Sequence, residues 1–263
     1  MSAAAAERGW ALITGASRGI GAAFAAALAP EYRLILSGRS VADLERIRAG
    51  CGRPPEEVVC LPADLNRDGA GELLRAVNER RLAVELLVNN AGLGSGGAFS
   101  GLRVERELEE VRVNVAALVA LTHGCLAGMR ERGRGAVIQV ASTASFQPVP
   151  FLATYAATKA FVLHFSLALH EELREEGIHV MALCPGPTRT GFFETAGIPP
   201  RADGMQTPRE VVALALRGLE RRKPLVVCGG RNRAMVAAER LVPRAVLARL
   251  VGMAMRSWRL PEG

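Results

Sequence analysis

The stretch WALITGASRGIG (10–21) opens with a run of apolar residues and ends in a glycine-rich turn. Residues 10–17 have the length and composition of a buried strand, and GAAFAAALA, which begins at Gly21, has those of a helix. Gly15, Gly19 and Gly21 leave the turn between them free of side chains. A strand, a glycine-rich turn and a helix in this order are typical of the first unit of a nucleotide-binding α/β fold.

The same alternation continues along the chain. Apolar runs lie at 32–39, 57–65, 86–92, 135–142, 178–186 and 224–230, and helical patterns lie between them near 41–49, 69–81, 103–132, 154–176 and 208–221. The apolar runs do not alternate with polar residues, so both faces of each strand are expected to be covered. The sequence therefore predicts a single α/β domain over 1–263 with a doubly wound parallel seven-stranded sheet, a core at 9–230 and a helical extension at 231–263.

Composition narrows the class of protein. The chain has 263 residues, of which 49% are hydrophobic and 22% charged, as in a soluble globular domain. No apolar run approaches the roughly 20 residues of a membrane span, and the start lacks a secretory signal. The five cysteines show no metal-binding spacing and the four histidines form no HExxH motif, so no metal site is predicted. We interpret the cysteines as reduced thiols of a cytoplasmic protein.

The net charge of +7 is concentrated near the C-terminus, where residues 217–263 hold eleven Arg or Lys and three Glu. Within this region 242–260 reads as a basic amphipathic helix, with Arg249, Arg256 and Arg259 opposite an apolar stripe that includes Trp258. The helix can dock on its own domain, pair with a partner subunit or rest on a membrane surface, and the sequence leaves these alternatives open. Nucleic-acid binding is not predicted, because interleaved aromatics and known recognition motifs are missing.

The glycine-rich turn predicts a dinucleotide site. Backbone N–H groups and the positive end of a helix can hold a diphosphate where no side chain intervenes. Arg39 follows the second strand, which ends without an acid, and a cation there favours a 2′-phosphate; we therefore predict NADP(H), with Arg18 able to reach the same region. Asp64 either accepts a hydrogen bond from the adenine or only caps a turn. The other predicted cofactor-binding residues are Ser17, Ile20, Leu65, Asn90, Ala91, Gly92, Pro185 and Gly186.

YAATK (155–159) holds one of the two tyrosines and one of the two lysines of the chain. Tyr155 and Lys159 are four residues apart in a predicted helix and so share a face. A free phenol has a pKa near 10, and a neighbouring ammonium lowers it. The pair predicts a phenol that transfers protons near neutral pH; the alternative is an exposed lysine beside a packed tyrosine.

Taken together, TGxxxGxG, NNAG (89–92), Asn114, Ser142, YxxxK and PGPTRT (185–190) resemble the short-chain dehydrogenase/reductases over about 10–230. The resemblance implies a Rossmann fold and an oxidoreductase that forms a homodimer or homotetramer. It implies that Tyr155 is the acid/base, that Ser142 holds the substrate oxygen and that Lys159 binds the nicotinamide ribose and tunes the tyrosine. Asn114 would position a water, and Thr188 would bind the nicotinamide carboxamide.

Three loops that follow strand ends, 93–100, 145–154 and 190–206, carry apolar side chains. We predict that they form a pocket for a hydrophobic ketone, aldehyde or secondary alcohol, with 190–206 as a lid. Fatty-acyl-, steroid- and aromatic-like carbonyls fit that description. The predicted pocket residues, besides Ser142, are Leu93, Phe146, Phe151, Phe192 and Phe193. Two alternatives stay open: these residues only pack the loops, or the chain is a non-catalytic NADP(H)-binding sensor or scaffold.

Overall fold

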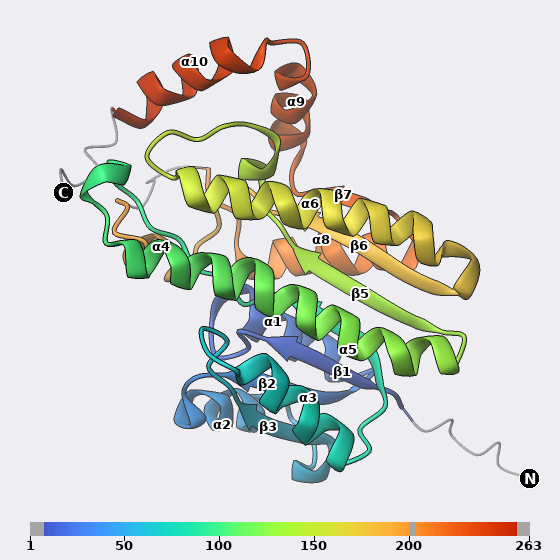
Figure 1. Ribbon diagram of the computed structural model, residues 1–263. Helices are drawn as coiled ribbons and strands as arrows, with labels where there is room; N and C mark the ends of the chain where they lie inside the picture. Colours follow the sequence, from blue (N-terminus) through green and yellow to red (C-terminus); the bar gives the residue numbers. More distant parts are fainter. Residues whose placement is uncertain (1–7, 200–203, 257–263) are drawn as a thin grey trace, which may run out of the picture.

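The computed structural model describes residues 8–199 and 204–256. Its centre is a sheet of parallel strands in the order β3-β2-β1-β4-β5-β6-β7 (Figure 1). The strands are β1 (Trp10–Thr14), β2 (Arg33–Gly38), β3 (Val58–Pro62), β4 (Val84–Asn89), β5 (Gly135–Val140), β6 (Ile178–Cys184) and β7 (Leu225–Val227). The predicted seven-stranded doubly wound sheet is confirmed, and its order reverses between β1 and β4.

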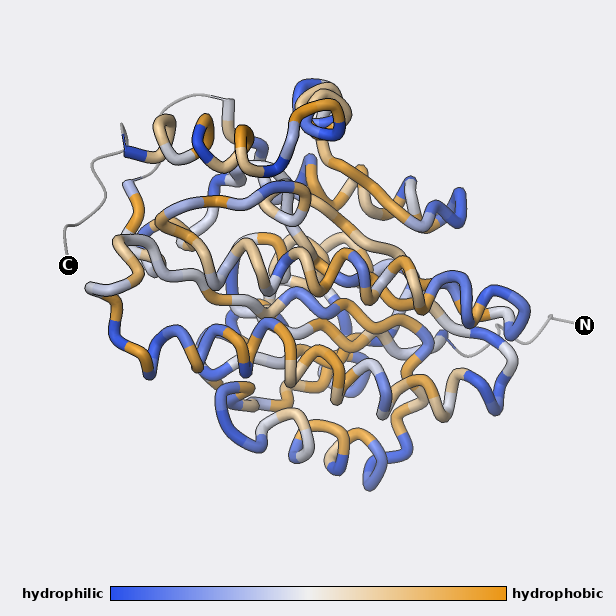
Figure 2. The backbone as a smooth tube through the Cα atoms, turned by 45° about the horizontal axis from the view of Figure 1, so that its top comes forward, coloured by the Kyte–Doolittle hydropathy of each residue, from blue (hydrophilic) through white to orange (hydrophobic). Residues whose placement is uncertain are grey.

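Helices cover both faces of the sheet. One face packs against α1 (Gly19–Leu28), α2 (Val41–Gly50) and α8 (Pro208–Glu220). The other packs against α3 (Gly69–Glu79), α5 (Ala117–Glu131) and α6 (Ala153–Leu173). The helix α4 (Val104–Val111) packs beside α6. Figure 2 shows the consequence: apolar strands run through the middle of the molecule, and the helices turn their hydrophilic sides outward.

The strand side chains explain why the apolar runs are continuous. In β1, Ala11 and Ile13 belong to the same core cluster as Phe24 of α1. Their neighbour Leu12 belongs to the cluster on the opposite face, together with Leu121 of α5. Successive side chains of a strand point to opposite faces, so a strand covered on both sides is apolar at most of its positions.

The helix predicted at 103–132 is one long helix, Val104–Glu131, with a π-helical turn at Arg112–Ala116. By length and composition alone it is apolar enough to cross a membrane. In this fold Leu121 and Met129 are buried in the core beneath the sheet. The apolar character of the helix is therefore used in packing against β4 and β5.

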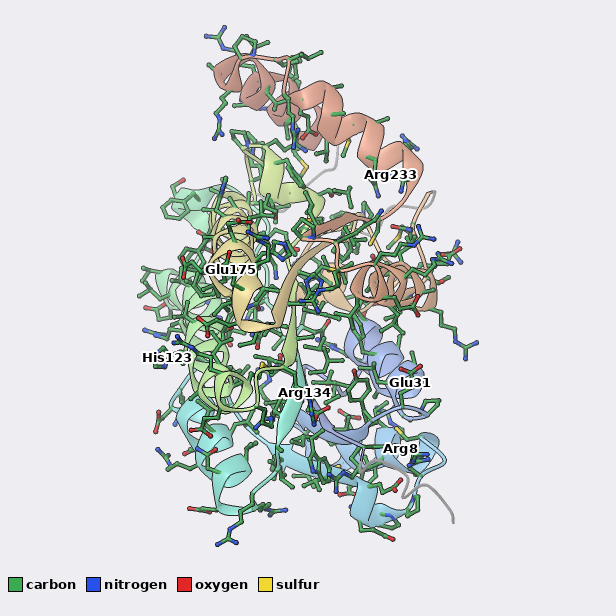
Figure 3. All side chains as sticks on the ribbon, turned by 90° about the vertical axis from the view of Figure 1, so that its right-hand side faces the viewer. Arg8, Glu31, His123, Arg134, Glu175 and Arg233 are labelled. Carbon is green, nitrogen blue, oxygen red and sulfur yellow. The ribbon has the colours of Figure 1, made fainter. Side chains whose placement is uncertain are left out.

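The two ends of the parallel strands carry different kinds of residue. The carboxyl ends of the strands meet the loops that carry the predicted site residues. Figure 3 faces the amino ends of the strands, where Arg8, Arg134 and Glu175 precede β1, β5 and β6. Arg134 is exposed there and forms an ion pair with Glu85 at 2.8 Å. These charged surface residues therefore lie at the end of the strands opposite to the predicted site.

The extension predicted at 231–263 contains two helices in its described part, α9 (Gly230–Glu239) and α10 (Arg244–Arg256). They rise beyond β7 and lie above the loop that leads into α6 (Figure 1). A Cβ atom added to Gly252 of α10 would lie 3.3 Å from Cγ of Pro150 in that loop. The C-terminal helices therefore lie over the carboxyl ends of the strands, where the predicted site is.

Candidate active site

The glycine turn after β1 has the shape of an anion cradle. Gly15 and Gly19 adopt φ angles of +62° and +56°, which side chains disfavour. A Cβ atom on Gly21 would lie 2.1 Å from the carbonyl oxygen of Gly15, so only glycine fits there. The first turn of α1 has neither an acidic residue nor a side-chain cap, and its N–H groups are free to hold an anion. These residues fit the diphosphate of a dinucleotide.

Asn90 fastens the end of β4 to this turn. Its Nδ2 donates hydrogen bonds to the carbonyl oxygens of Thr14, at 2.9 Å, and Gly15, at 3.2 Å. Its backbone N–H donates to Oγ1 of Thr14 at 3.0 Å. The NNAG motif therefore fixes the shape of the glycine turn as well as forming part of the wall beside it.

A cavity of about 770 Å³ runs along the carboxyl ends of the strands. Most of the predicted cofactor-binding residues lie in its wall, namely Gly15, Ser17, Arg18, Gly19, Ile20, Arg39, Asp64, Leu65, Asn90, Ala91, Gly92, Tyr155, Lys159, Pro185, Gly186 and Thr188. Gly21 is not in the wall; it is buried, and its lack of a side chain allows the close approach of the Gly15 carbonyl oxygen. The structure thus brings together residues spread over more than half of the sequence.

The charged groups at the cofactor end have separate tasks. Arg39 follows β2 at the cavity wall and is exposed. Arg18 donates instead to Oγ1 of Thr195 at 3.3 Å, so its guanidinium is turned toward the predicted lid. Asp64 accepts from the N–H of Asn66 at 3.1 Å, which is the turn-capping alternative, while it also lines the cavity.

Three of the four predicted catalytic residues line the cavity beyond the cradle. Ser142 follows β5, and its Oγ accepts from the N–H of Ala144 at 3.1 Å while the hydroxyl also hydrogen-bonds Tyr155. Lys159 Nζ donates to the carbonyl oxygen of Val140 at 2.8 Å. Nζ lies 5.8 Å from the centre of the Tyr155 ring, as the spacing in α6 predicts. Ser142, Tyr155 and Lys159 therefore form one cluster.

Asn114 lies behind this cluster, in the π-helical turn. Its Oδ1 accepts from the N–H of Leu93 at 2.8 Å, and its Nδ2 donates to the carbonyl oxygen of Leu93 at 2.9 Å and to Oγ1 of Thr158 at 3.0 Å. The side chain is buried and uses these bonds to hold the loop after β4 against α6. Its predicted role with a water stays a prediction.

The expectation of an acidic phenol is wrong for the free protein. Burial raises the pKa of Tyr155 to about 12, and the hydrogen bond from Ser142 offsets this only in part. Burial also lowers the pKa of Lys159 to about 8. Desolvation disfavours the charged form of both groups and is the largest cause of both shifts. The stable form of Tyr155 is thus the protonated one.

The outer part of the cavity is apolar and only partly as predicted. Leu93, Phe192 and Phe193 lie in its wall, and the ring centres of Tyr155 and Phe192 are 5.0 Å apart. Phe146 and Phe151 are outside the wall. Phe146 packs in the cluster between α6 and β6. Phe151, at a φ of +67°, offers its carbonyl oxygen to the N–H of Gly97 at 3.0 Å, so it shapes the loop from behind.

The predicted lid is tied at its base. The N–H of Arg189 donates to the carbonyl oxygen of Gln206 at 2.8 Å, and the N–H of Gln206 donates to that of Pro187 at 3.0 Å. The segment between them forms the short helix α7 (Phe192–Thr195), and residues 200–203 lie outside the described part. The lid therefore leaves and rejoins the fold at one point beside the cavity.

The sequence interpretation missed the contribution of the C-terminal helices to this wall. Residues of α9 and α10 that line the cavity are Arg231, Asn232, Met235, Ala238, Glu239, Leu247, Val251, Ala254 and Met255. The apolar stripe of 242–260 was the available signal, and one of its faces does dock on its own domain. Another face, with Val246, Leu250 and Met253, is 46–60% exposed. Trp258 of the predicted stripe and Arg259 of the face opposite it lie outside the described residues.

Known proteins resemble both the sequence and this geometry. A family model described as short chain dehydrogenase matches residues 9–198. The ketoacyl reductase HetN of Nostoc sp. is 28% identical over 220 residues, which cover 82% of this chain and 77% of that protein. A very-long-chain 3-oxoacyl-CoA reductase of Phaeosphaeria nodorum is 36% identical over 182 residues. The matched region is 66% of this chain but only 53% of that longer protein.

Solved structures agree with the fold. A short-chain dehydrogenase from Sphingobium yanoikuyae in complex with NADPH has a TM-score of 0.79 and 32% identity, and covers 88% of this chain and 94% of its own. A second, from Burkholderia phymatum in complex with NAD, has a TM-score of 0.78 at 24% identity, over 88% and 92% of the two chains. The family match covers the glycine cradle, the NNAG turn and the Ser142, Tyr155 and Lys159 cluster, and the chain therefore belongs to the short-chain dehydrogenase/reductase family of nicotinamide-dependent oxidoreductases.

Proposed function

We propose that this oxidoreductase uses NADP(H) to interconvert a hydrophobic ketone and its secondary alcohol. The observation that carries the proposal is the position of the Ser142, Tyr155 and Lys159 cluster. It lies where the glycine-lined end of the cavity meets the apolar end. A carbonyl compound held by the apolar wall reaches the two hydroxyls at that junction.

The bound nicotinamide supplies or accepts the hydride. The protein manages the oxygen and its proton. Ser142 and Tyr155 present hydroxyl donors to the carbonyl oxygen, on which negative charge develops during reduction. Tyr155 is protonated in the free protein, because burial raises its pKa, and it can deliver a proton to that oxygen. Lys159, fixed by the carbonyl of Val140, places a positive charge beside the phenolate that remains.

The preference for NADP(H) rests on Arg39. The segment that ends β2 has no carboxylate to accept from an adenine-ribose 2′-hydroxyl, and Arg39 presents an exposed guanidinium at the cavity wall. A guanidinium binds a charged phosphate more strongly than it binds a neutral hydroxyl. The relative that binds NADPH supports this choice, while the one that binds NAD shows that the fold accommodates either.

The hydrophobic substrate rests on the outer wall. Phe192, Phe193, Leu247, Val251 and Met255 face the cavity there. Apolar surface removed from water contributes about 25 cal/mol per Å², so a long or bulky apolar substrate gains most from this wall. The names of the relatives, which include a ketoacyl reductase, point to the same class of carbonyl compound.

Oxidation of NADPH against a graded series of ketones tests the proposal, with the series repeated with NADH. We expect kcat/KM to rise with the apolar size of the ketone and to be higher with NADPH. Preference for small charged ketones contradicts the hydrophobic substrate, and preference for NADH contradicts the role of Arg39. Cofactor binding without turnover of any carbonyl supports the sensor or scaffold alternative.

We also propose that the chain forms a homodimer or homotetramer. Val104, Leu108 and Val111 of α4 and Phe161 of α6 are 40–61% exposed, and the two helices pack side by side. Apolar side chains gathered on adjoining helices are typical of subunit contacts. Light scattering after size-exclusion chromatography measures the mass, and a Leu108→Glu variant is expected to shift it toward the monomer.

For the exposed face of α10 we propose contact with an anionic membrane surface. Val246, Leu250 and Met253 face outward, and Arg249 and Arg256 accompany them on the exposed helix. Basic helices with an apolar face bind in the interface of anionic bilayers. Flotation with phosphatidylserine vesicles, compared with phosphatidylcholine vesicles, tests this contact. Equal recovery of wild type and Leu250→Glu contradicts it.

A further inference from the structure

A line of buried polar residues runs along the helix that covers the site. Glu107, Glu110 and Asn114 are spaced three and then four residues apart, so they share one face of the helix. Their exposed fractions are 6%, 0% and 1%. Carboxylates this deeply buried are rare unless a cation pairs with them. Among the described ion pairs the nearest arginine in sequence, Arg106, pairs with Glu109 instead, at 2.7 Å.

This polar face holds two segments together. Asn114 bonds Leu93 in the loop after β4 and Thr158 in α6. One helical turn earlier, Glu110 Oε2 lies 2.8 Å from Oγ of Ser95, in the same loop. Glu107 hydrogen-bonds both Ser95 and Thr154, and Thr154 directly precedes Tyr155. Like Asn114, the two glutamates therefore connect the loop after β4 to α6, at a point next to the catalytic tyrosine.

Counting hydrogen atoms shows that this arrangement needs one more proton than two carboxylates provide. The hydroxyl of Ser95 has a single hydrogen and lies within hydrogen-bond distance of both Glu107 and Glu110. It can donate to only one of them. The second contact is a hydrogen bond only if that carboxyl is protonated and donates to Oγ. Glu110 is fully buried, and its Oε1 has no hydrogen-bond partner among the described residues, so it is the carboxyl better suited to be neutral.

We propose that Glu107 and Glu110 hold one proton between them and act as positioning residues for Tyr155. In the favoured state Glu110 donates to Ser95, Ser95 donates to Glu107, and Thr154 donates to the other oxygen of Glu107. This chain fixes the loop after β4 and the first turn of α6 relative to each other. The shared proton stands on the geometry alone, whereas the positioning role rests on the proposed function.

The charges around the pair agree with a proton held near neutral pH. Burial raises the pKa of Glu110 to about 7, and the negative charge of Glu107 adds to this effect. The hydrogen bond from Ser95 and the positive charges of Lys159 on α6 and Arg106 on α4 oppose it. Tyr155, which faces the pair from α6, is neutral over this range. When Glu110 ionises, its contact with Ser95 loses its hydrogen, and the loop loosens from α6.

Thermal unfolding against pH tests the shared proton without any substrate. The pKa of Glu110 is higher in the folded chain, about 7, than the roughly 4.3 of an unfolded glutamate. The stabilising effect of its proton is therefore complete below about pH 4.3 and is lost as pH rises through about 7. Glu110→Gln keeps a donor at that place and has no proton to lose.

We expect the Tm of Glu110→Gln, relative to wild type, to rise between pH 5 and about pH 7 and to level off by pH 8. Glu105→Gln, an exposed residue of the same helix, is the matched control and is expected to follow wild type at every pH. A Tm difference for Glu110→Gln that does not change with pH overturns the shared proton. Because this measurement uses no carbonyl compound, it stands even if the proposed function fails.

Kinetics test the positioning role. We expect Ser95→Ala to lower kcat about tenfold, the equivalent of one strong hydrogen bond, while the Kd for NADPH is unchanged. Ser95→Thr, which keeps the hydroxyl, is expected to restore most of that activity. Glu110→Gln is expected to stay within about twofold of wild-type kcat at pH 6 and to exceed it at pH 8. Equal kcat for Ser95→Ala and wild type, or equal pH profiles for Glu110→Gln and wild type, overturns the positioning role.

Discussion

The two ends of the cavity are built by opposite means. The cofactor end is built largely of backbone and glycine from the turns that follow β1, β4 and β6, with Arg39 and Asp64 added from the turns after β2 and β3. The outer end is mainly apolar, with side chains from the loops after β4 and β5, from the predicted lid, and from α9 and α10, although α9 also brings Arg231, Asn232 and Glu239 to the cavity wall. The glycine turn tolerates almost no added atom, because a Cβ at Gly15 or Gly21 would collide with neighbouring protein atoms. A wall of flexible side chains can adjust, so a substitution there is expected to change the preferred substrate more than the chemistry.

The largest effect is expected at the junction of the two ends. Tyr155→Phe removes the proton donor, and positioned acids contribute about 10²–10⁴-fold to such reactions. We expect kcat to fall by that factor while the Kd for NADPH, measured by fluorescence titration, changes little. Tyr32→Phe, at the only other tyrosine, is the control. Unaltered turnover by Tyr155→Phe would remove the basis for the proposed chemistry.

A titration separates the two interpretations of the tyrosine. With its pKa at about 12, Tyr155 is expected to show no phenolate absorbance until the pH exceeds about 11. The difference spectrum between wild type and Tyr155→Phe isolates this one phenol. A phenolate that appears near pH 8 supports the acidic phenol predicted from the sequence and contradicts the structure.

At the cofactor end a single methyl group is expected to be harmful. The Cβ of Gly21→Ala would lie 2.1 Å from the oxygen of Gly15 and 2.6 Å from Nδ2 of Asn90. Overpacking of this kind costs about 1–3 kcal/mol, so we expect NADPH affinity to fall about 10-fold or more and Tm to fall with it. Gly50→Ala, at the end of α2 with nothing within 4 Å, is expected to leave both unchanged or to raise Tm slightly.

Arg39→Ala tests the selectivity of the same end. Hydrogen bonds to charged groups contribute about 1.5–3 kcal/mol when enclosed, and Arg39 is exposed, so we expect about a tenfold loss of NADPH affinity. NADH affinity is expected to change by less than about twofold, because that cofactor lacks the phosphate. Arg46→Ala, an exposed arginine of α2 paired with Asp43, is the control. Equal losses for both cofactors would point to a general charge effect.

The smallest effect is expected at the outer end. Met255→Ala removes part of the apolar wall, and each CH₂ group taken out of contact costs about 0.8 kcal/mol, so KM for the most apolar ketones is expected to rise about fivefold. The Kd for NADPH is expected to stay the same. Met253→Ala on the same helix, where the side chain is 60% exposed, is expected to change neither value. A loss of NADPH affinity in Met255→Ala would show that the two ends are not independent.

This difference between the ends also explains what the sequence could predict. The sheet, the glycine turn and the spacing of Tyr155 and Lys159 are local patterns, and all of them are found in the structure. The pKa of Tyr155 was mispredicted, because burial is a property of the whole fold and is not written in YxxxK. Phe146 and Phe151 were misplaced for a similar reason: an apolar residue in a loop can face the cavity or pack behind it.

The contributions of α10 and of Glu110 could not be deduced from local sequence at all. The stripe of 242–260 predicted an amphipathic helix, yet nothing in it indicated which part of the surface the helix would cover. Glu107 and Glu110 read as ordinary charged residues of a surface helix in the sequence. Only the packing of α4 against α6 and the loop after β4 shows that they are buried.

The part of the cavity wall formed by α9 and α10 has a practical consequence for redesign. It follows the last strand, so residues 229–256 form a contiguous cassette that contains neither the glycine cradle nor Ser142, Tyr155 or Lys159. Exchanging this cassette for the matching segment of a relative would replace the α9 and α10 part of the cavity wall in a single substitution of sequence. A library of such chimaeras would vary which carbonyl compound is accepted while every member inherits the same reaction centre.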